Sequence, residues 1–193
     1  MKRKIIGILL IVGLIIPTTC SAASTQHARA PIALSGQKEK LDQFSRLGFD
    51  TLHLWGENTM TAQSFCPTFP TLSRVQLGLR SYIYFADGTF TVSIRDSLDG
   101  QDLTAKTMSM KKVRHFVTWV SIDFTDIHIT PNKQYFIVVT YDHDLNLEWC
   151  TAHWNPYHQG MPWVYTTSPE PSWDLGYGEK FPDLCFRTYG IPG

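Results

Sequence analysis

The sequence predicts an all-β fold, and three observations lead to that prediction. Short segments in which apolar and polar residues alternate recur along the chain, as expected of half-buried strands. Turn signals, among them the Asp-Gly pairs at 87–88 and 99–100, separate these segments. No long segment has the apolar spacing of a helix. We therefore expect eight or nine short strands in an antiparallel β-sandwich of jelly-roll type.

Residues 1–23 have the three parts of a secretory signal peptide. Three basic residues, Lys2, Arg3 and Lys4, precede an uncharged apolar run at 5–16, and small residues follow it. The apolar run is shorter than the ~20 residues that a transmembrane helix needs. We expect a secreted or cell-surface protein with no membrane span in its mature chain. The alternative is that the segment is retained as an anchor.

Residues 24–50 are expected to be a flexible or partly helical lead-in to the β-sandwich domain at 51–193. Leu41, Phe44 and Leu47 follow one another at three-residue spacing, which predicts a short helix. The alternative is an irregular segment beside a strand. Loss of the signal peptide would leave 14 basic against 17 acidic residues, a net charge of −3. This balance argues against a nucleic-acid partner, which needs a basic face.

From residue 51 onward the apolar period is two. The segments at 82–85 and 90–94 flank an Asp-Gly turn and predict a hairpin. The almost continuous apolar run at 135–141 predicts a strand that is covered on both faces. The residues in the apolar phase of these runs are expected to form the core between the sheets. They are Val75, Leu77, Phe90, Val92, Ile94, Val120, Ile122, Phe124, Ile137, Val139 and Phe186.

An ordered set of short motifs also resembles a known type of module. The motifs are AQSF (62–65), LSRV (72–75), FTVSIRDSL (90–98), ITP (129–131), YFIVV (135–139) and FRTYG (186–190). Together they resemble the uncharacterised β-sandwich module of archaeal exported and cell-surface proteins, which is similar to carbohydrate-binding jelly rolls. The resemblance covers about residues 55–190 and implies an exported β-sandwich. It brings no catalytic residues to this chain.

Aromatic residues are dense after Cys150, in a stretch that is rich in Pro, Gly and Asn. Exposed Trp and Tyr rings can stack on the apolar faces of sugars, while amides and carboxylates bind the hydroxyl groups. The alternative is that these aromatics fill the core or cap one end of the sandwich. The predicted ligand-binding residues are Trp154, Tyr157, Trp163, Trp173 and Tyr177, with Asn155 and Asp174 as polar partners.

Two further features concern metal ions and cysteines. Asp142 and Asp144 place oxygen ligands at alternating positions, which suits a structural calcium ion, although a polar turn is the alternative. Cys66, Cys150 and Cys185 remain after removal of the signal peptide. For an exported chain we expect a Cys150–Cys185 disulfide and one free thiol, and the alternative is three buried free thiols.

The sequence contains no motif of a known catalytic class, so we expect a protein that is not an enzyme. The leading hypothesis is an exported binding module for glycan or cell-envelope polysaccharide. The alternative is a structural or adhesion component that contacts envelope proteins, and a small secreted hydrolase is a third possibility.

Overall fold

A computed structural model describes residues 38–46, 48, 50–53, 60–83, 87–141, 146–152, 157–166, 171–175 and 182–193. All of these residues belong to one compact unit, Pro31–Gly193. The described residues form twelve strands and one short 3₁₀ helix, η1 (Met110–Lys112), so the prediction of an all-β chain is confirmed. The predicted signal peptide lies outside the described residues.

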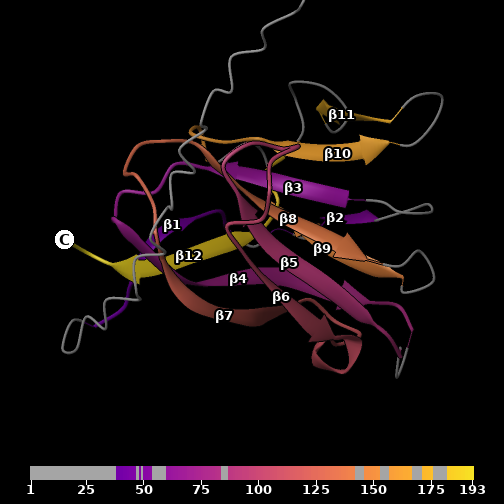
Figure 1. Ribbon diagram of the computed structural model, residues 1–193. Coiled ribbons are helices and arrows are strands. Elements are labelled where there is room, and N and C mark those ends of the chain that lie inside the picture. The colour runs from indigo at the N-terminus through magenta and orange to yellow at the C-terminus, as the bar shows by residue number, and fades with distance from the viewer. Residues whose placement is uncertain are drawn as a thin grey trace, which may run out of the picture. The chain divides into compact units, whose positions relative to one another are not determined.

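The strands form two antiparallel sheets that pack as a sandwich (Figure 1). In the first, sheet A, the strand order is β1 (Lys40–Phe44), β12 (Phe186–Ile191), β4 (Thr71–Ser81), β9 (Leu147–Thr151) and β2 (Asp50–His53), and β7 (Thr118–His128) pairs with β4. In the second, sheet B, the order is β11 (Ser172–Leu175), β10 (Pro162–Thr166), β3 (Met60–Phe65), β8 (Tyr135–Tyr141), β5 (Thr89–Arg95) and β6 (Thr104–Ser109).

The main core lies between the two sheets and contains side chains from both. Ten of the eleven predicted core residues are buried there, and Phe124 is only half-buried. The reason is a bulge in β7: three residues, 124–126, lie opposite the single residue Ser73 of β4. Extra residues in one strand interrupt the alternation of its side chains. Phe124, at the start of this bulge, still packs against the main core, but it is less completely covered than Val120 and Ile122.

The lead-in predicted for residues 24–50 is in part a strand, because β1 pairs with β12 and the backbone N–H of Gln43 donates to the Thr188 hydroxyl at 3.0 Å. Between Leu41 and Phe44 the strand advances three residues while its partner advances two. The three-residue spacing that predicted a helix therefore belongs to a β-bulge, and the helical interpretation is wrong.

The hairpin predicted around the Asp-Gly pair at 87–88 is also wrong. β4 belongs to sheet A, whereas β5 pairs with β6 and β8 in sheet B, so the turn carries the chain from one sheet to the other. Gly88 has φ 126°, a backbone conformation that residues with a Cβ atom rarely adopt. The pair at 99–100 does join two neighbours, β5 and β6, and the Gly100 N–H donates to the Ser97 carbonyl at 3.1 Å.

Candidate functional site

Three of the aromatic residues after Cys150 come together on the outer face of sheet B. β10 and β11 pair with Tyr165 opposite Trp173 and with Trp163 opposite Leu175, so all four side chains lie on one face. The rings of Tyr165 and Trp173 meet edge to face, with their centroids 5.3 Å apart. Each of the three rings is half-buried. We call Trp163, Tyr165 and Trp173 the aromatic face.

The aromatic face rests on a second hydrophobic cluster, outside the sandwich core. Trp163 and Trp173 pack against buried Ala62 of β3 and against buried Phe136 and Val138 of β8. β8 is consequently covered on both sides, as its continuous apolar run predicted. Because the cluster fixes one side of these rings, little conformational entropy remains to be lost when a ligand binds their other side.

A carboxylate in the loop between β5 and β6, that of Asp99, borders the aromatic face. The Trp173 indole Nε1 donates to Oδ1 of Asp99 at 3.0 Å, which fixes the orientation of the ring. Arg95 donates from Nε to Oδ1 of Asp102 at 2.6 Å and from Nη1 to the Leu98 carbonyl at 3.0 Å. Both aspartates are exposed and offer further oxygen atoms to a ligand. The sequence indicated only a turn at 99–100, so Asp99 and Asp102 were not predicted as polar partners of a ligand.

The structure separates the other predicted ligand-binding residues from this face. Asp174 lies on the opposite side of β11 from Trp173, and its carboxylate accepts from the Thr166 hydroxyl at 3.2 Å. Asp174 is therefore not a polar partner of these rings. Trp154, Asn155 and Tyr177 lie outside the described residues.

Tyr157 is a core residue, with 7% of its surface exposed, and cannot belong to a binding face. Its ring packs edge-on against Phe186, with the centroids 5.1 Å apart. Its hydroxyl donates to Oε1 of Gln43 at 3.1 Å and accepts from the Cys66 N–H at 2.9 Å. Burial raises the pKa of Tyr157 to about 12, so the hydroxyl remains protonated.

The same buried network contains Asp183. Its carboxylate accepts from the Tyr157 N–H at 2.8 Å and from Nε2 of Gln63 at 3.1 Å. Burial raises the pKa of Asp183 to about 6, against the opposing effect of these hydrogen bonds and of His158. The network joins both sheets and closes one end of the core, so we assign it a structural role.

The described cysteines, Cys66, Cys150 and Cys185, are free thiols, so the predicted Cys150–Cys185 disulfide is not found. The two residues are neighbours, since the Cys185 N–H donates to the Cys150 carbonyl at 2.7 Å. Their thiols, however, donate to backbone carbonyls that precede β2: Cys150 to Gly48 at 3.2 Å and Cys185 to Arg46 at 3.1 Å. Contact with the Cys150 thiol, together with burial, raises the pKa of Cys185. All three thiols are free, as the alternative had it, but only Cys150 and Cys185 are buried, and Cys66 is half-buried.

The predicted calcium ligands, Asp142 and Asp144, lie outside the described residues. Within the described part of the chain, no three His, Cys, Asp or Glu side chains converge in a way that suits a metal ion.

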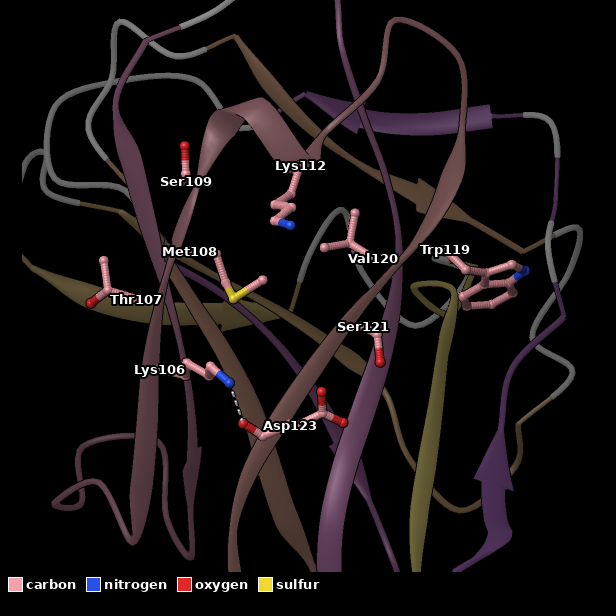
Figure 2. Close-up of a pocket in the computed structure, with 9 residues that line it drawn as sticks. All are labelled: Lys106, Thr107, Met108, Ser109, Lys112, Trp119, Val120, Ser121 and Asp123. Carbon is pink, nitrogen blue, oxygen red and sulfur yellow. Dashed lines mark hydrogen bonds between the residues drawn. The ribbon is translucent and has the colours of Figure 1, made fainter.

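A groove of about 510 Å³ lies between β6 and β7, the neighbouring edge strands of the two sheets (Figure 2). Met108 and Val120 contribute apolar surface, and Lys106 and Lys112 contribute positive charge. The Lys106 Nζ donates across the groove to the Asp123 carbonyl at 2.8 Å. The Asp123 carboxylate is 3.6 Å from Nε of Arg74, so part of its charge is already compensated.

Trp119 also borders this groove, but its indole lies on the opposite side of β7 from Met108 and Lys112 (Figure 2). The Arg187 guanidinium stacks on that indole, 4.1 Å from its centroid. The groove thus offers cations and hydroxyl groups rather than an open aromatic ring. Of the two surfaces, only the aromatic face presents several rings together.

Comparisons with known proteins add no relative. No protein-family model matches this chain, and no curated protein matches it. Among the residues that the structure describes, no helix combines the length and the apolar character needed to cross a bilayer.

Proposed function

We propose that this chain is an exported, non-catalytic module that binds glycan or cell-envelope polysaccharide through the aromatic face. The observation that carries the proposal is the convergence of Trp163, Tyr165 and Trp173 on the outside of sheet B. These rings are neighbours in space although they come from two strands. Sugar rings have apolar faces that stack on such surfaces, and burying an aromatic ring covers a large area at little entropic cost.

The polar groups beside these rings support a glycan ligand over a purely apolar one. Asp99 and Asp102 lie in the β5–β6 loop, and Asp99 is in direct contact with Trp173. Carboxylate oxygens accept hydrogen bonds from sugar hydroxyls. A ligand would therefore stack on the rings and direct its hydroxyl groups toward this loop.

Binding to a panel of envelope and plant polysaccharides tests the proposal. Trp163→Ala or Tyr165→Ala should weaken binding of a ligand found in the panel by ~1–2 kcal/mol, about fivefold to thirtyfold. Trp119→Ala is the matched control, because this ring is also half-buried but lies on sheet A. Isothermal titration gives the affinities, and melting curves show whether each variant is folded.

Two outcomes would refute this assignment. If the intact protein binds no member of a broad panel, the glycan hypothesis fails, and an adhesion component that contacts envelope proteins becomes the better interpretation. If Trp119→Ala weakens binding as much as Trp163→Ala does, the protein binds glycan, but elsewhere.

Export is a separate part of the proposal and rests on the basic, apolar and small-residue pattern of residues 1–23. N-terminal sequencing of protein recovered outside the cell should find a chain that begins near Ala23 or Ser24. Material that still begins at Met1 would contradict cleavage and would favour a retained anchor.

A further inference from the structure

Two loops at one end of the sandwich expose large apolar side chains. Tyr82 and Ile83 follow β4, Phe116 precedes β7, and their exposed fractions are 46%, 42% and 65%. The Ser81 N–H donates to the Arg114 carbonyl at 2.9 Å and so joins the loops. This end lies where β6 leads into η1 (Figure 1). We call Tyr82, Ile83 and Phe116 the apolar tip.

The apolar tip is not a random scatter of exposed hydrophobic residues. It contains three of the six exposed large apolar side chains in the described part of the chain. The rings of Tyr82 and His115 meet edge to face, with the centroids 6.5 Å apart, and the Arg80 guanidinium lies over the Tyr82 ring, 4.5 Å from its centroid. Exposed apolar patches of this kind mark surfaces that contact a partner or a membrane.

Positive charge surrounds the apolar tip. Lys111, Lys112 and Arg114 are exposed, and the segment 110–119 contains no acidic residue. The described acid that pairs with this group is Asp87, whose Oδ1 is 3.5 Å from the Lys111 Nζ. Lys112 also lines the groove between β6 and β7, so the positive charge continues along that groove to Lys106 (Figure 2). The local charge is thus positive in a chain whose mature form would be negative.

We propose that this end of the sandwich docks on anionic lipid membranes, with the apolar tip in the headgroup region and the surrounding cations on lipid phosphates. Apolar side chains on loop tips can enter a bilayer interface without any unfolding of the sandwich. Tyrosine and other aromatic rings favour that interface because they combine an apolar body with a polar end. Each Lys or Arg close to an anionic surface strengthens binding by about fivefold. This inference is independent of the aromatic face, which lies on sheet B.

Charge distinguishes a lipid surface from a protein partner here. A protein partner would need a negatively charged patch whose shape also matches this tip. Among the described residues at this tip, three exposed cations, Lys111, Lys112 and Arg114, outnumber the single acid Asp87, and the positive charge extends to the groove. A surface of uniform negative charge, such as an anionic bilayer, complements that arrangement best.

Vesicle sedimentation tests the proposal with the whole chain. The protein should sediment with vesicles of phosphatidylcholine and phosphatidylglycerol at 3:1, and much less with phosphatidylcholine alone. The double variant Ile83→Ser/Phe116→Ser should lower the partition coefficient at least tenfold, because it removes the inserted side chains. The double variant Lys112→Glu/Arg114→Glu should lower the partition coefficient at least as much. For the wild-type protein, 0.5 M salt should lower the partition coefficient about tenfold.

Matched controls come from other parts of the surface. Leu103→Ser removes an apolar side chain that is as exposed as Ile83 but lies in the β5–β6 loop, and Lys38→Glu reverses an exposed charge. Both controls should partition like the wild-type protein, and the melting temperature shows whether each variant is folded. Loss of vesicle binding in the controls as well, or equal binding to neutral vesicles, would overturn the proposal. Size-exclusion chromatography tests the alternative that the tip contacts a second copy of this chain. In that case the tip variants would convert a dimer into a monomer, and the protein would not bind vesicles.

Discussion

At the scale of single residues, Asp183 makes the stability of the fold depend on pH. Its pKa of about 6 in the folded protein exceeds the ordinary value of 3.8, because burial penalises the charged form. The folded state therefore holds the proton more tightly than the unfolded chain does. The resulting stabilisation is complete below about pH 4 and is lost as the pH rises through 6. Over this range we expect a loss on the order of 2–3 kcal/mol.

The variant Asp183→Asn should remove this contribution. Its free energy of unfolding, measured by urea denaturation at several pH values, should change less between pH 4 and 6.5 than that of the wild-type protein. Asp174→Asn, at an exposed carboxylate on β11, is the control and should keep the wild-type profile. Identical profiles for wild-type and Asp183→Asn would show that this carboxyl group does not titrate in that range.

The two phenylalanines Phe186 and Phe124 should differ in their contributions to stability. Phe186 is fully buried in the core, so Phe186→Ala should cost ~3–5 kcal/mol. Phe124 lies at the β7 bulge and is half-buried, so Phe124→Ala should cost less than about 2 kcal/mol. Urea denaturation of both variants checks this order, and a larger loss at Phe124 would contradict the position of the bulge.

At the scale of secondary-structure elements, the register between β12 and β4 depends on a glycine. The pairing shifts between Tyr189 and Gly190, where the backbone passes very close to β4. A Cβ atom at Gly190 would lie 1.9 Å from the Thr71 carbonyl oxygen, which is backbone and cannot rotate away. A side chain at this position would therefore force the two central strands of sheet A apart.

Gly190→Ala should consequently destabilise the protein by more than about 2 kcal/mol, as expected when overpacking shifts the backbone. Gly193→Ala is the control, because a Cβ atom there would be 3.4 Å from the nearest atom, in the Pro70 ring. Thermal melts of the two variants should differ clearly. A Gly190→Ala variant as stable as Gly193→Ala would show that the strands do not approach so closely.

At the scale of the whole molecule, the core should unfold as one unit. Its buried side chains come from both sheets, and Trp149, with its Nε1 donating to the Cys185 carbonyl at 2.9 Å, lies within it. The tryptophan fluorescence, to which buried Trp149 contributes, and the far-ultraviolet circular dichroism of the strands should therefore change at the same urea concentration. Two separate transitions would indicate that the sheets unfold independently.

Core residues were predicted in five strands, β4, β5, β7, β8 and β12, and their inward phase is correct where the strands are regular. Val75, Leu77, Val92 and Ile137 are buried because side-chain alternation is a local property that each strand carries by itself. The incomplete burial of Phe124 comes from a bulge, which depends on how β7 matches β4 rather than on either strand alone. Likewise, the spacing of Leu41 and Phe44 suits a helix or a bulge, and only pairing with β12 decides between them.

The candidate site was predicted only in part, for a similar reason. Trp163 and Trp173 were identified from aromatic density, but density does not show which face of a strand a residue occupies. The register of β10 with β11 places these two rings with Tyr165 and directs Asp174 away from them. Asp99 reaches Trp173 from 74 residues earlier in the chain, and no local pattern marks that contact.

Sequence patterns alone predicted the all-β character of this protein, the segments that become most of its described strands, and ten of the 22 buried residues described in its main core. These properties follow from periodicity and turn chemistry, which act over a few neighbouring residues. The pairing of distant strands was needed to show that the turn at 87–88 crosses between sheets, that Tyr157 is buried, and that Trp163, Tyr165 and Trp173 share one face. Strand order and register depend on the free energy gained when surfaces far apart in the chain are buried together. A short stretch of sequence contains only one of these surfaces and so cannot determine that free energy.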